Sequence, residues 1–383
     1  MAENGSRRIR LGMVGGGTGA FIGYVHRIAS RLDGDYDLVA GALSSRPEVA
    51  RESGRNLGLA EDRIYASYEE MAQAESQRPD GIEAVAIVTP NNVHFGPAKT
   101  FLEAGIHVIC DKPLTSTLED ARALAKVRPK RGAKFLLTHN YTGYPLIRQA
   151  RELVKSGALG KIRVVQVEYP QDWLAMPADP DNKQAAWRTD PKRSGAGGCI
   201  GDIGTHAYNL ARFVTGLRTQ AVSADLHTFV KGRKVDDNVH ILLRFSGGAR
   251  GMLWASQVAP GNENGLQLRV YGERASIVWR QDNPNSMWFS ELGKPAQLLT
   301  RGGSISQPPA ASMNVRIPAG HPEGYLEAFA TLYSQFAEVI RGNGREHAPL
   351  LPSLADGVEG VEFIAAAIQS SRNDGKWTRL SDV

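Results

Sequence analysis

The feature that most constrains the fold is a glycine-rich turn near the N-terminus, at residues 15–20. An apolar run at residues 9–14 precedes this turn, and apolar residues recur at helical spacing after it, from Phe21 to Leu32. A strand, a glycine turn and an amphipathic helix in this order are typical of a parallel α/β unit. Short apolar runs and helical patterns then alternate, which predicts a doubly wound parallel sheet over about residues 7–138.

The turn itself reads Gly-Gly-Gly-Thr-Gly-Ala and fits the pattern G-x-G-x-x-A. In such a turn the first glycine allows a tight bend, the second leaves room for a pyrophosphate, and the last small residue lets the helix pack close to the strand. The N–H groups at the start of the helix then face the phosphates. We therefore predict a dinucleotide site formed by Gly15, Gly17, Thr18, Gly19 and Ala20.

The residues after the second predicted strand bear on which dinucleotide binds. They are Ser44, Ser45 and Arg46, and none of them is the carboxylate that usually holds the adenosine ribose of NAD. An arginine and two serines can accept the 2′-phosphate of NADP, and Ser44 can equally bond a plain ribose. From these residues, both NAD and NADP remain open.

The pattern changes after residue 138. A helix is predicted at residues 144–156 and a strand at 162–169, and a second helix follows. Five further strand-like runs are separated by turn residues, at 221–229, 239–245, 250–257, 266–271 and 276–279. Residues 302–320 are rich in Gly, Ser and Pro and predict a loop, and helices are expected at about 323–341 and 354–371. The prediction is a second α/β domain, residues 139–383, with a large, mainly antiparallel open sheet.

Two stretches carry side chains suited to proton transfer. Asp111 and Lys112 follow a predicted strand, at the edge where doubly wound sheets bind ligands. Asp202 and His206 lie four residues apart at the start of a predicted helix, and would share one face of it. Since a histidine titrates near neutrality, His206 suits the role of general base for a hydroxyl, and Lys112 can stabilise the alkoxide that forms.

Taken together in this order, the motifs resemble those of the Gfo/Idh/MocA oxidoreductase family. The resemblance extends from residue 9 to about residue 368 and rests on the glycine turn, on residues 86–94 with 105–113, and on residues 198–206. It implies a Rossmann domain followed by an α/β domain whose open sheet often forms an oligomer interface. A homodimer or homotetramer is therefore expected, with NAD slightly favoured over NADP as the cofactor.

The resemblance also implies roles for single residues. Lys112 and His206 match the family's catalytic lysine and histidine, and Asp202 matches the aspartate that accompanies them. Asp111 stands where the family usually has glutamate, and Asn209 stands where it often has aspartate, which weakens any case for an extended proton relay. The residues expected beside the cofactor, apart from the glycine turn and the serine–arginine stretch, are Thr89, Pro90, Asn91, His94, Asp111, Lys112 and Asn140.

The expected substrate is a sugar, an inositol or a related polyol. Tryptophans beside polar side chains suit such a ring, because its apolar face can stack while its hydroxyls find partners. Lys183, Arg188 and His321 are also candidates for binding an anionic group. The predicted substrate residues are Lys112, Tyr141, Gln171, Trp173, Trp187, Arg188, Asp202, His206 and His321.

These residues predict an NAD(P)-dependent oxidoreductase that moves hydride between nicotinamide and a secondary hydroxyl. A redox-neutral glycoside hydrolase that oxidises its sugar transiently would use the same lysine, aspartate and histidine. A non-catalytic dinucleotide-binding regulator is a third possibility, but such a protein needs none of the three.

The composition limits which partners, metals and cellular location can be expected. The chain has 383 residues and a net charge of +5, without the lysine and arginine blocks that mark nucleic-acid binding. Its two cysteines, Cys110 and Cys199, show neither a disulfide framework nor metal-ligand spacing. No apolar run approaches the ~20 residues of a membrane span. We expect a cytoplasmic enzyme with a small-molecule substrate, no metal, and no nucleic-acid or membrane partner.

Overall fold

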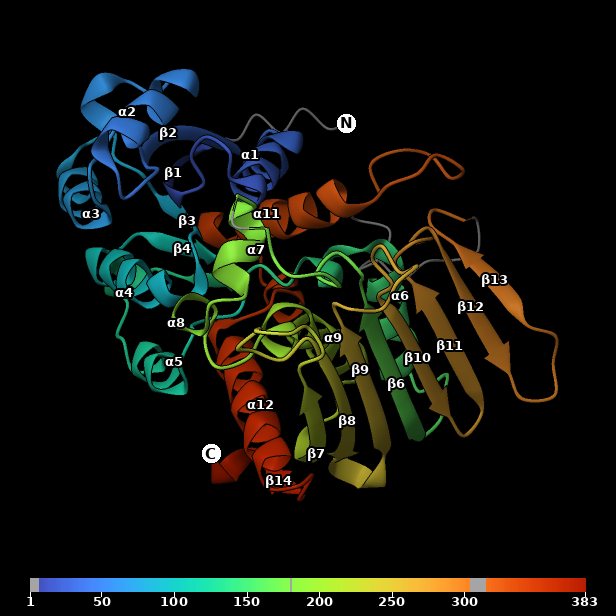
Figure 1. Ribbon diagram of the computed structural model, residues 1–383. Coiled ribbons are helices and arrows are strands. Elements are labelled where there is room, and N and C mark those ends of the chain that lie inside the picture. Colours follow the sequence, from blue (N-terminus) through green and yellow to red (C-terminus); the bar gives the residue numbers. More distant parts are fainter. Residues whose placement is uncertain (1–6, 180, 304–314) are drawn as a thin grey trace. The chain divides into compact units, whose positions relative to one another are not determined.

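The computed structural model describes residues 7–179, 181–303 and 315–383 (Figure 1). The chain forms two compact units, one of Met1–Asn140 with Tyr325–Val358 and the other of Tyr141–Gly324 with Glu359–Val383. The sequence analysis divided the chain once, after residue 138. In the structure, the later stretch Tyr325–Val358 belongs to the first unit. Much of the loop predicted at 302–320, namely residues 304–314, lies outside the described residues.

The first unit contains the predicted parallel sheet. Its strands lie in the order β2-β1-β3-β4-β5, and every neighbouring pair runs parallel. The strands are β1 (Ile9–Gly15), β2 (Tyr36–Ala42), β3 (Ala84–Val88), β4 (His107–Cys110) and β5 (Phe135–Leu137). The helices are α1 (Phe21–Leu32), α2 (Pro47–Asn56), α3 (Tyr68–Gln77), α4 (Phe95–Ala104), α5 (Leu118–Ala125) and α11 (Tyr325–Arg341). The Rossmann architecture expected for this half of the chain is confirmed.

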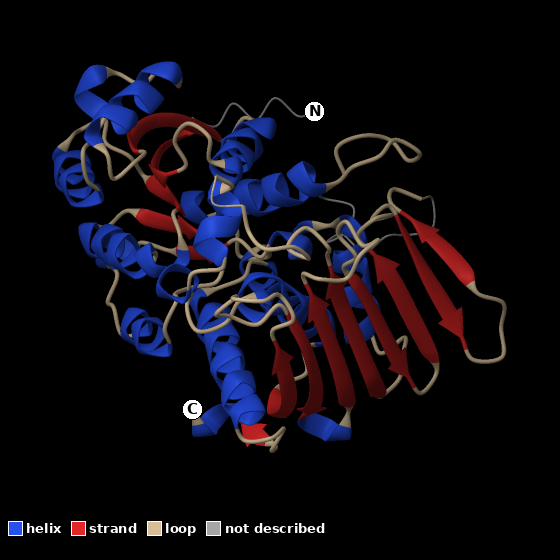
Figure 2. Ribbon diagram, in the orientation of Figure 1, coloured by secondary structure: helices blue, strands red, loops and turns tan. Residues whose placement is uncertain are grey.

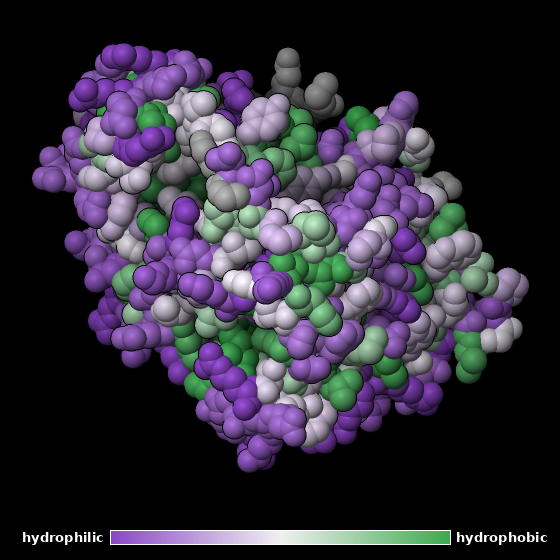
Figure 3. All heavy atoms as spheres, in the orientation of Figure 1, coloured by the Kyte–Doolittle hydropathy of each residue, from purple (hydrophilic) through white to green (hydrophobic). Residues whose placement is uncertain are grey.

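Helices α2 and α3 were not predicted. Both are rich in charged and amide side chains, so neither shows a long apolar face in the sequence. Figure 3 shows the surface around them as mainly hydrophilic. The buried contacts of α3 include a carboxylate, Glu75, which pairs with Arg63 (Nη2 to Oε2, 2.5 Å) and accepts from the Tyr65 hydroxyl (2.8 Å). Hydrophobic periodicity cannot detect a helix fixed in this way.

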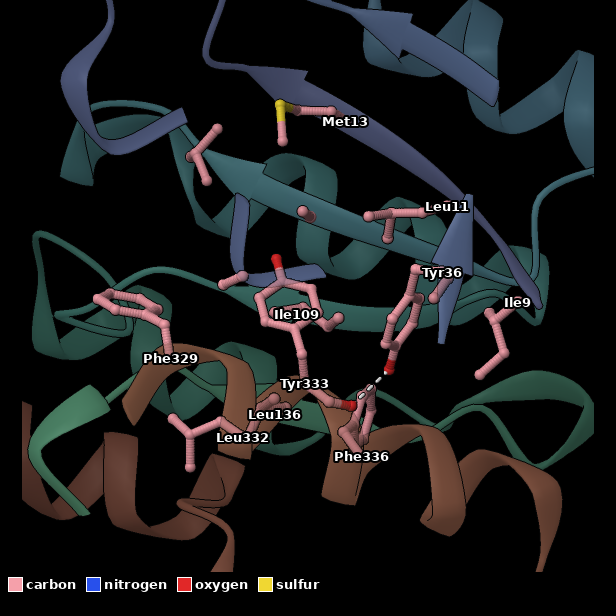
Figure 4. Close-up of a cluster of buried hydrophobic side chains, with 14 of the residues drawn as sticks. Ile9, Leu11, Met13, Tyr36, Ile109, Leu136, Phe329, Leu332, Tyr333 and Phe336 are labelled. Carbon is pink, nitrogen blue, oxygen red and sulfur yellow. Dashed lines mark hydrogen bonds between the residues drawn. The ribbon is translucent and has the colours of Figure 1, made fainter. Parts of the chain in front are cut away.

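The return of α11 to the first unit has a clear packing reason. Phe329, Tyr333 and Phe336 of α11 are buried in one cluster with apolar residues of the parallel sheet, including Leu11 and Tyr36 (Figure 4). The Tyr36 hydroxyl also donates to the backbone carbonyl of Tyr333 (3.0 Å). Burying each large apolar side chain contributes about 1.5–3 kcal/mol. The helix therefore belongs to the core of the dinucleotide-binding unit although it lies near the C-terminus.

The second unit contains a nine-stranded sheet, seen as the row of long strands in Figure 2. The strand order is β13-β12-β11-β10-β6-β9-β8-β7-β14, and only the β6–β9 pair of this sheet is parallel. The strands are β6 (Ile162–Pro170), β7 (Thr219–His227), β8 (Asn238–Phe245), β9 (Arg250–Ser256), β10 (Gln267–Gly272), β11 (Ala275–Arg280), β12 (Ser286–Glu291), β13 (Gln297–Thr300) and β14 (Thr378–Arg379). The predicted large, mainly antiparallel sheet is confirmed, and β12, β13 and β14 are additions to it.

Helices of this unit carry the segments that matter for chemistry. They are α6 (Pro145–Lys155), α7 (Lys183–Arg188), α8 (Pro191–Ser194), α9 (Thr205–Thr215) and α12 (Leu354–Arg372), whose first residues belong to the first unit. A π-helical turn, Ile200–Gly204, runs directly into α9. Within the described ranges, no helix has the length and apolar character that crossing a membrane requires.

Candidate active site

The turn between β1 and α1 has the backbone that a dinucleotide cradle requires. Gly15, Gly16 and Gly19 adopt φ angles of 77°, 72° and 80°, in the left-handed region that favours glycine. At Gly17 a Cβ atom would lie 2.8 Å from the carbonyl oxygen of Leu43, so a side chain cannot be accommodated there. Predicted residues 15–19 therefore form a turn lined by backbone alone, except at Thr18.

Two details of this turn differ from the simple motif. Ala20 is the N-cap of α1 rather than the point of closest packing. That point is Gly23, where a Cβ atom would lie 2.4 Å from the Cα of Gly16. The amide of Thr18 donates to the Ser53 hydroxyl of α2 (3.0 Å), so α2 braces the turn. Ser53 lies 35 residues beyond Thr18, and no local pattern in the sequence connects them.

The carboxyl edge of the parallel sheet holds buried polar atoms of two predicted cofactor residues. The Thr89 hydroxyl and the Asn140 side-chain nitrogen are buried without a hydrogen-bond partner among the described residues. Since buried polar groups are normally bonded, such atoms favour a polar ligand at this edge. Together with the glycine turn, they fit a nicotinamide dinucleotide.

His94 connects the two loops at this edge. Its imidazole is buried, with Nδ1 2.8 Å from the Pro113 carbonyl oxygen and Nε2 3.0 Å from the Thr89 carbonyl oxygen. Burial lowers the pKa of His94 from its usual value. Nearby, Asn91 is also buried and begins a short turn after Pro90. His94 thus contacts the backbone of both loops from a buried position and helps to fix their conformation.

Lys112 follows β4 in a turn fixed by its neighbour. The Asp111 carboxylate accepts from the Lys112 amide (2.9 Å) and from the Thr138 hydroxyl (3.0 Å). The buried His139 lies close enough that the Lys112 charge adds to burial in lowering its pKa to about 3. His139 is therefore neutral at physiological pH. Neither Thr138 nor His139 was singled out from the sequence.

The serine–arginine stretch lies between β2 and α2. The Ser44 hydroxyl accepts from the Arg46 amide (3.1 Å), and Arg46 is the N-cap of α2. Ser45 and Arg46 are both exposed. Their side chains can therefore meet a ligand at the end of β2 without displacing a packed group.

In the second unit, Asp202 lies in the π-helical turn and His206 in the first turn of α9. The imidazole of His206 is 8 % exposed and lies against two tyrosines. Its ring centroid is 4.9 Å from that of Tyr141 and 6.3 Å from that of Tyr169, both edge-on, and the two tyrosine hydroxyls are hydrogen-bonded to each other. Tyr169 is thus a further candidate beside the predicted Tyr141.

Asp202 has two defined partners on one oxygen. The Nε of Arg188 (3.1 Å) and the side-chain amide of Gln257 (2.9 Å) both donate to Oδ2. The structure therefore brings together the predicted Arg188 and Asp202, and adds Gln257 of the second sheet. The guanidinium of Arg188 also lies over the ring of Trp187, 4.3 Å from its centroid.

A chain of side-chain amides runs beside this group. The Trp173 indole donates to Gln171 (3.0 Å), Gln171 donates to Asn264 (2.8 Å), and Asn264 donates to Gln281 (3.0 Å). Asn264 also bonds the Tyr141 side chain. Gln171, Trp173 and Tyr141 therefore form one hydrogen-bonded network. His321, in contrast, lies in an exposed segment where its backbone carbonyl accepts from Arg301.

Asp236 anchors the segment that carries Asp202. Its carboxylate accepts from the amides of Gly198 (2.7 Å) and Ile200 (2.8 Å), and its backbone carbonyl accepts from Cys199 (2.8 Å). At Gly198 a Cβ atom would lie 2.3 Å from that carbonyl, so the glycine is required by the close approach. Among the described residues, no group of His, Cys, Asp or Glu is placed to hold a metal ion.

Asp236→Asn is expected to destabilise the protein by about 1–3 kcal/mol at pH 7, because the amide nitrogen faces a backbone donor and leaves it unsatisfied. Burial raises the pKa of Asp236 to about 6, above about 3.9 for an unfolded aspartate. The pH-linked part of the stability, which is separate from the two hydrogen bonds that the carboxylate accepts, is therefore fully present below about pH 3.9 and is lost as the pH rises through 6. Asparagine does not titrate, so the difference between the two proteins narrows over this range. Urea unfolding of both proteins across this range measures the effect, and identical midpoints would contradict it.

Comparison with known proteins agrees with this geometry. Residues 9–141 match the model of an oxidoreductase family with an NAD-binding Rossmann fold, and residues 147–278 match the GFO/IDH/MocA C-terminal domain. The chain is 34 % identical to the uncharacterized oxidoreductase YfiI of Bacillus subtilis, over 98 % of each chain.

Two solved structures show the same fold. An oxidoreductase from Sinorhizobium meliloti is 52 % identical with a TM-score of 0.87, covering 97 % of this chain and 99 % of that one. An inositol dehydrogenase homolog from Azotobacter vinelandii, solved with NADH and myo-inositol, is 37 % identical with a TM-score of 0.90, covering 98 % of each chain. The chain therefore belongs to the GFO/IDH/MocA family of NAD-binding oxidoreductases.

Proposed function

We propose that this protein is a dehydrogenase that transfers hydride between nicotinamide and a secondary hydroxyl of a sugar, inositol or related polyol. The observation that carries the proposal is that each of the two units holds side chains suited to proton transfer or charge stabilisation. The dinucleotide-binding unit presents Lys112 at the end of β4, and the second unit presents Asp202 and His206 on one continuous helical segment. The relative solved with NADH and myo-inositol supports the choice of substrate class.

In the direction of oxidation, His206 accepts the hydroxyl proton, and Lys112 stabilises the negative charge that develops on the oxygen. The oxidised nicotinamide, when bound, supplies the acceptor for the hydride that leaves the same carbon. Asp202 either accepts a hydrogen bond from a neighbouring hydroxyl of the substrate or orients the imidazole of His206. Tyr141 and Tyr169 hold the imidazole edge-on, which restricts its orientation.

An uncharged substrate suits the polar groups of the second unit best. The positive charge of Arg188 is already matched by Asp202, and the nearby chain of Gln171, Asn264 and Gln281 offers amides. Amides pair with hydroxyls as both donors and acceptors. Trp173 is partly exposed beside them and can stack on the apolar face of a ring.

The test is the absorbance of reduced nicotinamide, with purified protein, NAD or NADP, and a panel of inositols, aldoses, glycosides and sugar acids. The proposal predicts steady accumulation with a neutral polyol. Product release from a glycoside without net reduction would instead favour a redox-neutral hydrolase. Tight dinucleotide binding with no product from any member would favour a regulator.

We further propose that Ser44, Ser45 and Arg46 flank the adenosine ribose. Arg46→Asp is then expected to shift the ratio of kcat/KM for NAD over NADP towards NAD by at least about tenfold. The reason is that a carboxylate pairs with the ribose diol and repels a 2′-phosphate. The exposed Arg51→Asp on the same helix is the matched control. An unchanged ratio in Arg46→Asp would remove this stretch from the cofactor site.

We also propose a homodimer or homotetramer assembled through the open face of the nine-stranded sheet. Leu242 and Met252 pair across β8 and β9 and are 52 % and 37 % exposed. The same row continues across the sheet through Gln166, Arg269 and Val278 to Trp288 and Leu298, and the last two are also exposed. Exposed apolar side chains at both ends of this row favour association with a second copy.

The double substitution Leu242→Arg and Met252→Arg is expected to yield a monomer, because it places two charges at one apolar end of this row. Light scattering after size exclusion gives the mass. Leu292→Arg, in the turn after β12, is the control, since Leu292 is 82 % exposed outside the row. A wild-type monomer, or an unchanged mass in the double variant, would refute this interface.

A cytoplasmic location is part of the same proposal. Cys110 and Cys199 are both buried free thiols. Such thiols are usual in a reducing compartment.

A further inference from the structure

Two side chains that were not assigned a catalytic role approach the carboxylate of Asp202. Arg188 and Gln257 approach the same carboxylate oxygen, Oδ2, at 3.1 Å and 2.9 Å. Arg188 comes from the end of α7, while Gln257 directly follows β9. Two elements distant in the sequence thus converge on one oxygen of one side chain.

Each of the two donors is itself held in place. The Nη1 of Arg188 donates to the side-chain oxygen (2.7 Å) and the carbonyl oxygen (3.2 Å) of Gln184, one turn earlier on α7. The flat guanidinium also lies over the Trp187 ring, and its centre is 5.8 Å from the Trp173 ring centroid. The guanidinium of Arg188 cannot move away from Asp202 without breaking these contacts.

The backbone of Gln257 is fixed as well. Its amide donates to the Asp237 carbonyl (2.8 Å), and its own carbonyl accepts from Leu174 (3.2 Å). Its side chain is almost fully buried. A buried neutral amide beside a cation favours a carboxylate over a carboxylic acid at Asp202, since both partners donate hydrogen and neither accepts it there.

We propose that Arg188 and Gln257 are positioning residues that keep the Asp202 carboxylate ionised and fix its orientation for catalysis. The inference deepens the proposed function and rests on it for the role of Asp202. It assigns Arg188 to the carboxylate rather than to an anionic group of the substrate. Sugar acids and sugar phosphates therefore gain nothing from this guanidinium.

The first test is kinetic. Arg188→Ala is expected to lower kcat/KM by about 10-fold or more. It is also expected to move the lower acid limb of the pH profile, which we assign to Asp202 and which lies below the limb of His206, to higher pH by about 1–3 pH units, because the carboxylate loses an adjacent cation. Arg188→Lys, which keeps the charge, is expected to restore the limb in part. Arg193→Ala, an exposed arginine on α8, is the matched control and should resemble the wild type. A rise in KM alone, with the limb unmoved, would overturn the inference and return Arg188 to substrate binding.

A second measurement does not depend on turnover. Carbon-13 NMR of carboxyl-labelled aspartate can follow Asp202, whose resonance is assigned by its loss in Asp202→Asn. The titration midpoint is expected to rise in Arg188→Ala, and to rise in Gln257→Leu by less, since an amide carries no charge. Midpoints equal to that of the wild type would overturn the inference. If the wild type reduces no cofactor while the midpoint still rises, the proposed function fails and the positioning of Asp202 stands.

Discussion

Lys112→Ala is expected to lower kcat by about 10²–10⁴-fold while the protein still binds the dinucleotide. The size follows from the loss of a charge that stabilises the developing alkoxide only in the transition state. Binding of the cofactor is retained because the glycine turn and the Ser53 brace do not involve Lys112. Steady-state kinetics and calorimetric titration with the dinucleotide measure the two quantities.

Lys99→Ala is the control for this variant, because Lys99 is an exposed lysine of α4 in the same unit. Removing it should change neither quantity. Turnover in Lys112→Ala close to that of the wild type would exclude Lys112 from the chemistry. Loss of dinucleotide binding would instead show that Lys112 acts mainly through the cofactor.

His206→Asn is expected to have an effect of similar size, about 10²–10⁴-fold on kcat/KM in the direction of oxidation. In the wild type this activity should rise with pH as the imidazole loses its proton and becomes a base. The variant should lose that limb, because asparagine does not titrate. His227→Asn, an exposed histidine of β7, should keep the wild-type profile. A pH limb that survives in His206→Asn would assign the base elsewhere.

The sequence predicts those parts of the fold that depend on local patterns. The alternation of apolar runs predicts the parallel strands β1 to β5, and the glycine turn predicts the cradle at Gly15–Gly19, because both need particular residues at adjacent positions. Helix α3 has no such signal, since it is fixed by the buried pair of Glu75 and Arg63. The return of α11 to the first unit likewise depends on shape and packing against β1 and β2, which composition does not encode.

The candidate site also contains residues that local patterns predict and residues that they do not. Lys112, Asp202 and His206 occur in short motifs and can be found without a structure. Their supporting residues cannot, because the contacts join distant positions. Gln257 lies 55 residues from Asp202 and Asp236 lies 38 from Gly198, so only the folded sheet brings them together. The partners of Asp202 also change the interpretation of Arg188, which the sequence placed at the substrate.

The proposed function requires that hydride passes directly from a polyol carbon to the nicotinamide. The most direct measurement uses the best substrate of the panel, deuterated at the carbon that bears the reacting hydroxyl, with mass spectrometry of the cofactor. Direct transfer predicts that the reduced nicotinamide formed carries a single deuterium from the substrate, and that turnover is slower than with the protonated substrate when hydride transfer limits the rate. Deuterium that remains on a released sugar product, or reduced nicotinamide without the label, would contradict the account.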